Sequence, residues 1–468
     1  MSLQENHTAD MQYKEVSPRE KYCFGIGAIG KDAICNLVGA FLMVYFTDTL
    51  YLAPAFVGIL FFVARIWDAI NDPMMGMIVD NTHTKYGKFR IWLTIGTLVN
   101  SVVFVLLFHS FGLQGKALYI YVSVMYILYG MTYTIMDVPY WSWLPNLTND
   151  PHEREKVSVI PRFFASLAGF SVSTFGLYII GGFNKMAGEE NTFAETGFTI
   201  FAIVIAVIFI VTIGITVFNV KEESTVGEKA QKTSFKEAIQ IIVKNDQLLA
   251  FIGLLLTYNL CTQIAKSFAV YYFKNVCGNE YLYSIFGFAI IAEMAGLVCF
   301  PKIAKKISRE KVYACACGLP VAGFVFLGTA GFVAPENPAF VVLSCALLFF
   351  GSGLSLGVTT CCMADVIDYG EVKFGVRNES VTCSAQTFLM KAAMAAAGGL
   401  TGVGLSVVGY DAKAAVQSAQ TIMGIRVLMI VVPIILAVVS FLIYKKFYLL
   451  KGNKMDEITS KLQKMHQN

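Results

Sequence analysis

The amino-acid sequence predicts an all-α polytopic membrane protein with twelve transmembrane helices in two pseudo-symmetric six-helix bundles. Hydrophobic residues make up 56% of the 468 residues and charged residues 15%, whereas a soluble domain carries about 25% charged residues. Mean hydropathy is +0.61. Apolar segments of about 20 residues, the length that crosses a bilayer as a helix, recur along the whole chain. We place their centres near residues 38, 66, 100, 127, 171, 207, 258, 290, 322, 349, 394 and 434.

A polar stretch divides these segments into two sets of six. The division predicts five parts: an N-terminal segment 1–21, a first bundle 22–220, a middle loop 221–245, a second bundle 246–447 and a tail 448–468. Ser234-Phe-Lys-Glu237 in the loop is a capping-box pattern, which predicts a short helix at the membrane surface. Two related bundles of this kind place a substrate site at their interface, near the middle of the membrane.

Lysine and arginine are concentrated in the turns on one side of the membrane. The turns after the second, fourth, eighth and tenth segments carry Lys85, Lys88, Arg90, Arg154, Lys156, Lys302, Lys305, Lys306, Arg309, Lys311, Lys373 and Arg377. The opposite turns carry single lysines. Because basic turns stay in the cytoplasm, both termini are expected to be cytoplasmic.

Several other function classes are disfavoured. The 11 cysteines form no CxxC pair and no metal-ligand spacing, so neither a disulfide framework nor a zinc site is expected. Gly25-Ile-Gly-Ala-Ile-Gly30 matches a dinucleotide-binding pattern but precedes a membrane span, which favours close helix packing instead. Metalloprotease, nucleophile-elbow and P-loop motifs are absent, so no enzyme is expected. The net charge of +4 carries no nucleic-acid signal.

Two carboxylates lie in the middle of the second apolar segment. Asp68 and Asp72 are four residues apart and share one face of a helix. A carboxylate inside a bilayer is costly unless it is paired, hydrated or bound to a cation, and two adjacent carboxylates also repel each other. A bound monovalent cation would relieve both costs, which indicates a cation-coupled transporter.

The fourth segment carries Asp137 and Trp141 one helical turn apart. A carboxylate can accept two sugar hydroxyls and an indole can pack on a pyranose face, so the pair suits a neutral polyhydroxyl ligand. The alternative is a buried aspartate bonded to another helix, beside an interfacial tryptophan. Lys31 and Asp32 in the first segment are either a binding pair or an interfacial charge pair. Arg162, at the start of the fifth segment, either pairs with Asp137 or Asp32 or extends to the cytoplasmic surface.

Three further charges lie inside predicted spans. Lys391 is deep in the eleventh segment and needs a partner, for which Asp68 and Asp72 are the obvious candidates. For Lys266 and Glu293, in the seventh and eighth segments, the simplest account is that they pair with each other. The alternative is that Lys266 faces the cavity and attracts an anionic substrate.

Seven motifs occur in the order that a known transporter family shows. They are Gly30-Lys-Asp32, Ala64-Arg-Ile-Trp-Asp-Ala-Ile-Asn-Asp-Pro73, Tyr86-Gly-Lys-Phe89, Thr134-Ile-Met-Asp-Val-Pro139, Pro161-Arg-Phe-Phe-Ala-Ser-Leu-Ala168, Ala364-Asp-Val-Ile-Asp-Tyr-Gly-Glu371 and Ser384-Ala-Gln-Thr387. Over about residues 20–450 the chain resembles the glycoside–pentoside–hexuronide:cation symporters, most of all the melibiose carriers. The resemblance implies the major facilitator fold and a location in a bacterial cytoplasmic (inner) membrane.

The resemblance also implies roles for individual residues. The implied cation site, for Na+, Li+ or H+, consists of Asp68, Asn71, Asp72 and Thr134. The amide carbonyl of Asn71 favours Na+. The implied sugar site consists of Asp32, Lys31, Asp137, Trp141 and Arg162. Coupling between the sites is expected from Lys391, Gln386 and Thr387. A cytoplasmic gate is expected from Asp365, Asp368, Glu371 and Arg377.

The expected activity is symport of a sugar, a galactoside such as melibiose, with Na+ (or H+ or Li+) by alternating access. A hexuronide, pentoside or β-glycoside is the alternative substrate, because Lys266 matches no position of the melibiose carriers. A lipid carrier would need an apolar cavity, and a sugar sensor would need a signalling domain that loops of about 25 residues do not supply. The expected partners are the sugar, the cation and the bilayer, with no nucleic acid and no cofactor, and the protein is expected to function as a monomer.

Overall fold

The computed structural model describes residues 16–82, 84–148, 151–222, 243–375, 379–414 and 416–467. Every regular element in these ranges is helical. Twelve helices are long and apolar enough to cross a membrane, and each contains one of the twelve expected centres. The predicted all-helical membrane fold is therefore confirmed. The surface helix expected near Ser234 lies outside the described residues.

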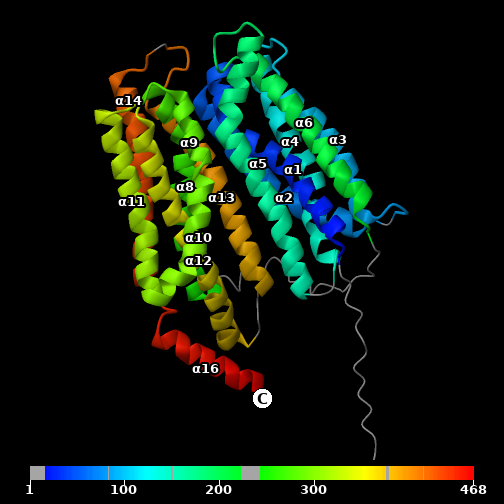
Figure 1. Ribbon diagram of the computed structural model, residues 1–468, viewed down its shortest axis with the longest axis vertical. Coiled ribbons are helices and arrows are strands. Elements are labelled where there is room, and N and C mark those ends of the chain that lie inside the picture. The colour runs from blue at the N-terminus through cyan, green and yellow to red at the C-terminus, as the bar shows by residue number, and fades with distance from the viewer. Residues whose placement is uncertain are drawn as a thin grey trace, which may run out of the picture.

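The first bundle contains six spanning helices (Figure 1). They are α1 (Pro18–Val44, continued by the π-helical turn Tyr45–Thr49), α2 (Pro54–Asp80), α3 (Lys88–Leu107), α4 (Gly115–Trp143), α5 (Pro151–Met186) and α6 (Glu195–Asn219). Helix α1 packs along α5 and α6, and α3 packs along α4 and α6.

The second bundle also has six spans, some of them built from shorter pieces. They are α8 (Asp246–Asn275), α9 (Ser284–Gly287) with α10 (Ala289–Lys306), α11 (Arg309–Val333), α12 (Pro338–Phe374), α13 (Glu379–Val407), and α14 (Ala419–Arg426) with α15 (Val432–Lys446). An amphipathic helix, α16 (Asn453–Gln467), runs beneath this bundle in Figure 1. It is held there by Ile458, which is buried in the same apolar cluster as residues of α8, α11 and α12.

Helix starts coincide with capping residues. Ser17 and Glu20 form a capping box, with Pro18 at the first position of α1. Asn245 caps α8 and Ser308 caps α11 through their side-chain oxygens. Such caps satisfy backbone N–H groups that would otherwise be left without partners at each helix start.

The start of α3 is fixed by a carboxylate that follows the last helix of the same bundle in sequence. Glu222, just beyond α6, accepts hydrogen bonds from the backbone N–H groups of Lys88 (2.6 Å), Phe89 (3.0 Å) and Arg90 (3.1 Å). A carboxylate at a helix N-terminus also complements the positive end of the helix dipole. A side chain at Gly87 (φ +94) would overlap this carboxylate, so the turn requires glycine. The contact joins the turn after α2 to the beginning of the middle loop.

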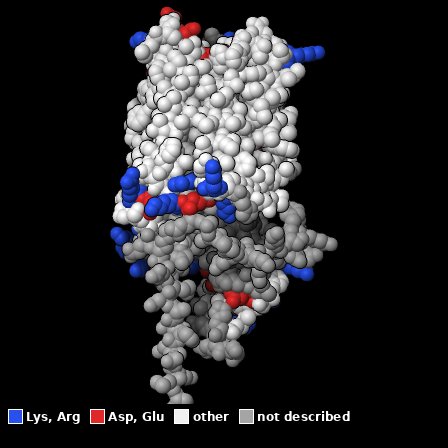
Figure 2. Space-filling model, turned by 90° about the vertical axis from the view of Figure 1, so that its right-hand side faces the viewer, with Lys and Arg blue, Asp and Glu red and all other residues white. Residues whose placement is uncertain are grey.

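An apolar belt surrounds the helices between two charged rims, as Figure 2 shows for one face. The lower rim in that view carries lysine and arginine together with a few acidic residues. The belt has the form expected of a surface covered by lipid.

The two bundles meet where small residues allow close approach. A Cβ atom at Gly402 of α13 would lie 2.3 Å from the Pro54 carbonyl oxygen of α2, and one at Gly58 would lie 2.8 Å from the Gly399 carbonyl oxygen. Close packing of backbones through glycine is a common way for membrane helices to associate. Nearby, the backbone N–H of Ala55 donates to the Ser406 hydroxyl at 2.9 Å.

A buried polar cluster links the bundles at the end opposite α16. Asp48, only 3% exposed at the end of α1, pairs with Lys274 of α8 and accepts from the Tyr410 hydroxyl at 2.8 Å. Thr47 donates to Asp48 and lies 2.8 Å from the Tyr271 hydroxyl. Because Asp48 belongs to the first bundle and Lys274, Tyr271 and Tyr410 to the second, this cluster holds the bundles together at that end.

Replacing Asp48 with asparagine is expected to loosen this end. Removing one partner of a buried ion pair costs about 3 kcal/mol, enough to shift a two-state equilibrium by about 100-fold toward separated bundles. The measurement uses a Ser406→Cys variant, with and without Asp48→Asn. It is the rate at which the introduced thiol reacts with a membrane-impermeant maleimide. Asp411→Asn, on the loop that follows Tyr410, is the matched control. An unchanged rate in Asp48→Asn would contradict the role of the cluster.

Candidate functional site

Lys31 lies at the centre of a charged cluster between α1 and α4. Its side chain is buried, and its ammonium lies 2.7 Å from one Asp137 oxygen and 3.4 Å from one Asp32 oxygen. It also donates to the Tyr133 hydroxyl at 3.4 Å. The cluster has two carboxylates for one cation, so acceptor capacity remains on both aspartates, whose side chains are partly exposed.

Aromatic rings enclose this cluster. The Lys31 ammonium lies 5.0 Å from the centroid of the Trp141 ring and 5.7 Å from those of Tyr133 and Tyr140. The Tyr140 hydroxyl donates to the Phe24 carbonyl at 2.7 Å, which fixes α4 against α1. Carboxylates beside aromatic faces form a suitable surface for a sugar, which has hydroxyls at its edge and C–H groups on its faces.

Arg162 is not part of this cluster in the structure. Its side chain is exposed on α5, and it forms no ion pair with any residue that the structure describes. The pairing considered for Arg162 with Asp32 or Asp137 is therefore not present in this conformation. Lys31 takes that position because it projects from α1 directly beside both carboxylates.

The two carboxylates of α2 lie against α4, and each pairs with a different basic side chain. The Thr134 hydroxyl donates to one Asp72 oxygen at 3.0 Å, and the Lys391 ammonium pairs with the other. The Arg65 guanidinium lies 3.1 Å from Asp68, one turn away on the same helix. A Cβ atom at Gly130 of α4 would lie 2.9 Å from an Asp68 oxygen, so α4 comes close to this carboxylate.

The donor set at this position suits an alkali cation. Asp68, Asp72 and Thr134 supply carboxylate and hydroxyl oxygens, which are the ligands that hard cations prefer. Asn71 lies between the aspartates in sequence, and its buried Nδ2 has no hydrogen-bond partner among the described residues. A carboxamide not fixed by its nitrogen can rotate to present its carbonyl oxygen to a cation.

Lys391 joins this cation position to the second bundle. The lysine belongs to α13, whereas its partner Asp72 belongs to α2. A cation bound at Asp72 would compete with this ion pair and so would act directly on a contact between the bundles. Gln386 is half-buried on α13, and the side chain of Thr387 lies outside the described residues.

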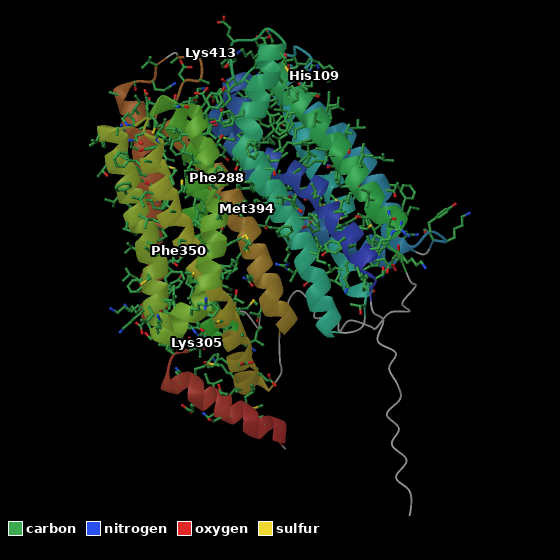
Figure 3. All side chains as sticks on the ribbon, in the orientation of Figure 1. His109, Phe288, Lys305, Phe350, Met394 and Lys413 are labelled. Atoms are coloured by element: carbon green, nitrogen blue, oxygen red, sulfur yellow. The ribbon has the colours of Figure 1, made fainter. Side chains whose placement is uncertain are left out.

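A cavity of about 310 Å³ lies between the bundles. The first bundle lines it with Asn36, Arg65 and Ser173, and the second with Gln263, Lys266 and Glu293, together with apolar and aromatic side chains. Met394 of α13, labelled in Figure 3, lies at this boundary. The lining therefore combines charged and amide side chains with a larger apolar surface.

Lys266 and Glu293 share this cavity but do not pair. No carboxylate that the structure describes lies within 4.0 Å of the Lys266 ammonium, which instead lies 5.4 Å from the centroid of the Phe349 ring. Glu293 accepts a hydrogen bond from the Ser352 hydroxyl at 2.8 Å. The simplest expectation for these two charges is therefore wrong: both face the cavity rather than each other.

The residues expected at a cytoplasmic gate lie at the α16 end of the second bundle. Asp365 of α12 pairs with Arg309 of α11 and accepts from the Tyr448 hydroxyl at 3.0 Å. These partners belong to the same half of the chain, so neither interaction crosses between the bundles. Asp368 and Glu371 also have partners, and Arg377 lies outside the described residues.

The sequence reasoning missed two groups of residues. Arg65 was not singled out, although its spacing of three from Asp68 places the two side chains together on a helix. Asp48 and Lys274 were also missed. An acidic residue at the end of one apolar segment and a single lysine at the same membrane side of another were the available signals.

Comparisons with known proteins identify similar transporters. The family described as MFS/sugar transport protein matches residues 23–451. The isoprimeverose transporter of Lactiplantibacillus pentosus is 31% identical over 446 residues, which is 93% of this chain and 91% of that protein. The raffinose carrier protein of Pediococcus pentosaceus is 29% identical over 99% of this chain and 73% of that protein.

Solved structures share the fold. An inward-facing, unoccupied bacterial homologue of the human lysosomal transporter Spinster superposes with a TM-score of 0.66 at 13% identity, covering 94% of this chain and 99% of that one. The nucleoside transporter NupG superposes with a TM-score of 0.61 at 12% identity, covering 91% of this chain and 98% of that one. At these identities the likeness establishes the arrangement of helices alone.

Proposed function

Because the chain belongs to the MFS/sugar transport protein family, we propose that it couples inward flow of Na+, Li+ or H+ to the uptake of a sugar. It is a multi-pass membrane transporter and not an enzyme. The observation that carries the proposed coupling is the ion pair between Asp72 and Lys391, which links the candidate cation site to the opposite bundle.

Cation binding would begin at Asp68 and Asp72. Lys391 now balances the negative charge of Asp72. A monovalent cation bound between the two carboxylates would neutralise that charge in its place. Thr134 would supply a hydroxyl ligand, and Asn71 would supply its carbonyl oxygen. Lys391 would then be released from α2, so that cation entry changes how the bundles hold together.

Sugar binding would follow at the cluster around Lys31. Asp32 and Asp137 would accept hydroxyls while Lys31 remains between them as a donor, and Trp141 would support the ring. Helix α4 carries both Asp137 of this cluster and Thr134 of the cation site, one turn apart. A cation that orders α4 would therefore raise the affinity for sugar. Bound sugar must then raise the affinity for the cation by the same factor.

Transport would then proceed by alternating access, in which the two bundles rock around the filled site. The Asp48 cluster joins the bundles at the end opposite the positively charged rim, and the Asp72–Lys391 pair joins them farther along α2. With both termini in the cytoplasm, as the lysine and arginine bias favours, that end faces away from the cytoplasm. The outer side is then closed in this conformation. A monomer is the proposed functional unit.

The proposed substrate is a glycoside, and a galactoside such as melibiose is the first candidate. Relatives named for isoprimeverose, raffinose and lactose transport support a sugar of two or three rings. The test is counterflow in proteoliposomes loaded with unlabelled sugar and diluted into labelled melibiose, raffinose, lactose or isoprimeverose. Transient accumulation of at least one sugar is expected. If none of them exchanges, while the reconstituted protein is folded, the assignment of the substrate to these glycosides fails.

A further inference from the structure

The eighth membrane span is interrupted at Phe288. It consists of the 3₁₀ helix η3 (Glu280–Tyr283) followed by α9 and α10. At the junction the backbone N–H of Phe288 donates to the Ile285 carbonyl at 3.1 Å, and that of Ile291 donates to the Phe288 carbonyl at 3.0 Å. Both hydrogen bonds join residues three apart, whereas a continuous α-helix joins residues four apart. A short 3₁₀ stretch inside a helix often marks a hinge.

The part of the span after the interruption is fixed to its own bundle. A Cβ atom at Gly353 of α12 would overlap the Glu293 carbonyl oxygen of α10. One at Gly296 of α10 would overlap the Phe350 carbonyl oxygen of α12. The Ser352 hydroxyl of α12 also donates to the Glu293 carboxylate at 2.8 Å. Backbones in such close contact leave α10 little freedom to move relative to α12.

The part up to the interruption, residues 280–288, is called the outer segment here and packs against the first bundle. Tyr281 stacks on Tyr178 of α5, with ring centroids 4.8 Å apart. The ring of Tyr283 meets that of Phe41 of α1 edge to face, with centroids 5.5 Å apart. One membrane span therefore has its two parts packed against different bundles.

The end of the outer segment lies very close to α5. A Cβ atom at Gly287 would overlap the Thr174 side chain and would lie 2.7 Å from the Thr174 Cα atom. Phe288, labelled in Figure 3, meets the ring of Phe170 of α5 edge to face, with centroids 5.3 Å apart. Because only glycine allows this approach, any larger residue at position 287 would force the outer segment and α5 apart.

The outer segment also forms part of the cavity wall. Tyr283, Phe286 and Gly287 line the cavity, as does Ser173 of α5. Phe286 keeps contact with its own bundle through the ring of Phe349 on α12, with centroids 5.7 Å apart. In Figure 1, α9 lies toward the end of the molecule opposite α16. Movement of the outer segment away from α5 would therefore open the cavity toward the side that faces away from the cytoplasm.

We propose that the outer segment is a gate of the cavity, which opens by bending at Phe288 away from α5 while α10 stays in place on α12. A few residues at the end of a helix can absorb such a change in backbone direction. Bending breaks the contacts with α1 and α5 but not the ion pair between Asp48 and Lys274. The cavity can then open outward before the bundles separate. The proposal rests on the proposed function, because such a gate serves a carrier whose cavity opens to the two sides in turn.

Gly287→Ala is expected to open the gate, because the added methyl group would overlap Thr174. The measurement is the rate at which a Ser173→Cys thiol reacts with a membrane-impermeant maleimide outside right-side-out vesicles, followed by mass spectrometry at that site. The rate should rise by about tenfold or more, the size expected for overpacking. Tyr178→Ala removes a stacked ring and adds no bulk, so it should raise the rate by about two- to tenfold. Gly253→Ala, where a Cβ atom would meet nothing nearer than 3.6 Å, is the matched control and should leave the rate unchanged.

A distance measurement separates bending of the outer segment from rocking of a whole bundle. Spin labels at Glu280 and Gln420 both lie in the second bundle, whereas labels at Lys185 of α5 and Gln420 of α14 lie in different bundles. In Gly287→Ala, bending should shift the distance distribution between positions 280 and 420. The distribution between positions 185 and 420 should stay as it is without the substitution. A shift between positions 185 and 420 alone would show rigid rocking and would overturn the inference.

Sugar counterflow by the wild type tests the proposed function separately, because neither the labelling nor the distances require bound sugar or cation. Unchanged labelling of Ser173→Cys in both Gly287→Ala and Tyr178→Ala, together with sugar counterflow by the wild type, would overturn the gate and leave the proposed function standing. If folded wild-type protein exchanges no sugar, the proposed function fails, whereas the labelling and the distances still decide whether the outer segment bends.

Discussion

Asp72→Cys is expected to abolish cation-driven sugar accumulation. Asp72 accepts from Thr134 and pairs with Lys391, so a cation bound there would meet both α4 and the second bundle. Cysteine removes the negative charge and both carboxylate oxygens. The measurement is uptake of labelled sugar into proteoliposomes under an imposed inward Na+ gradient, where the internal-to-external ratio should fall to about 1 because only equilibration remains.

The same variant should retain counterflow, since exchange of sugar across the membrane needs no net cation movement. Retained counterflow would show that the protein is folded and that the defect lies in coupling. Asp411 is an exposed acidic residue in the loop that follows α13. Asp411→Cys therefore controls for the introduced thiol. Full Na+-driven accumulation in Asp72→Cys would contradict the assignment of the cation site.

Asp137→Ala should produce the largest loss of sugar binding. Its carboxylate lies 2.7 Å from the Lys31 ammonium, which itself lies 5.0 Å from the centroid of the Trp141 ring. Two hydrogen bonds from sugar hydroxyls to a charged acceptor are worth about 3 kcal/mol or more, which corresponds to a loss of about 100-fold in affinity. Equilibrium binding of labelled sugar to purified protein measures this directly.

Binding of Na+ to the same preparation distinguishes local loss from unfolding. Asp137→Ala should still bind the cation, because Asp68, Asp72 and Thr134 are unchanged. Asp137→Asn keeps the size of the side chain and one acceptor, so it should lose less affinity than alanine. Sugar affinity that stays at the wild-type value in Asp137→Ala would place the sugar elsewhere in the cavity.

The fold could be predicted from the sequence because the bilayer imposes a simple rule. Each span must be a long apolar helix, so the twelve centres could be placed from hydropathy alone. Helix limits were harder to predict. Helix α5 begins at Pro151, ahead of Arg162, and α12 continues to Phe374, where Gly375 ends it in a left-handed conformation.

The sequence identified which charged residues belong to the site, but it predicted less well which residues they pair with. Lys391 was expected to pair with a carboxylate of the second segment, and it pairs with Asp72. Lys266 was expected to pair with Glu293 and does not. Pairing depends on helix rotation and on which side chains fill the space between helices, and hydropathy does not specify either.

If sugar transport is coupled to a cation, a cation gradient must drive sugar into the vesicle against the sugar's own concentration gradient. An uncoupled sugar carrier cannot do this. The direct test is uptake of labelled melibiose, or of whichever sugar exchanges best, into proteoliposomes with an imposed inward gradient of Na+ or, separately, of H+. We predict that the internal concentration rises above the external one under at least one of these gradients and falls back when an ionophore dissipates it. Uptake that only equilibrates, under every gradient, would contradict symport and leave a sugar carrier without coupling.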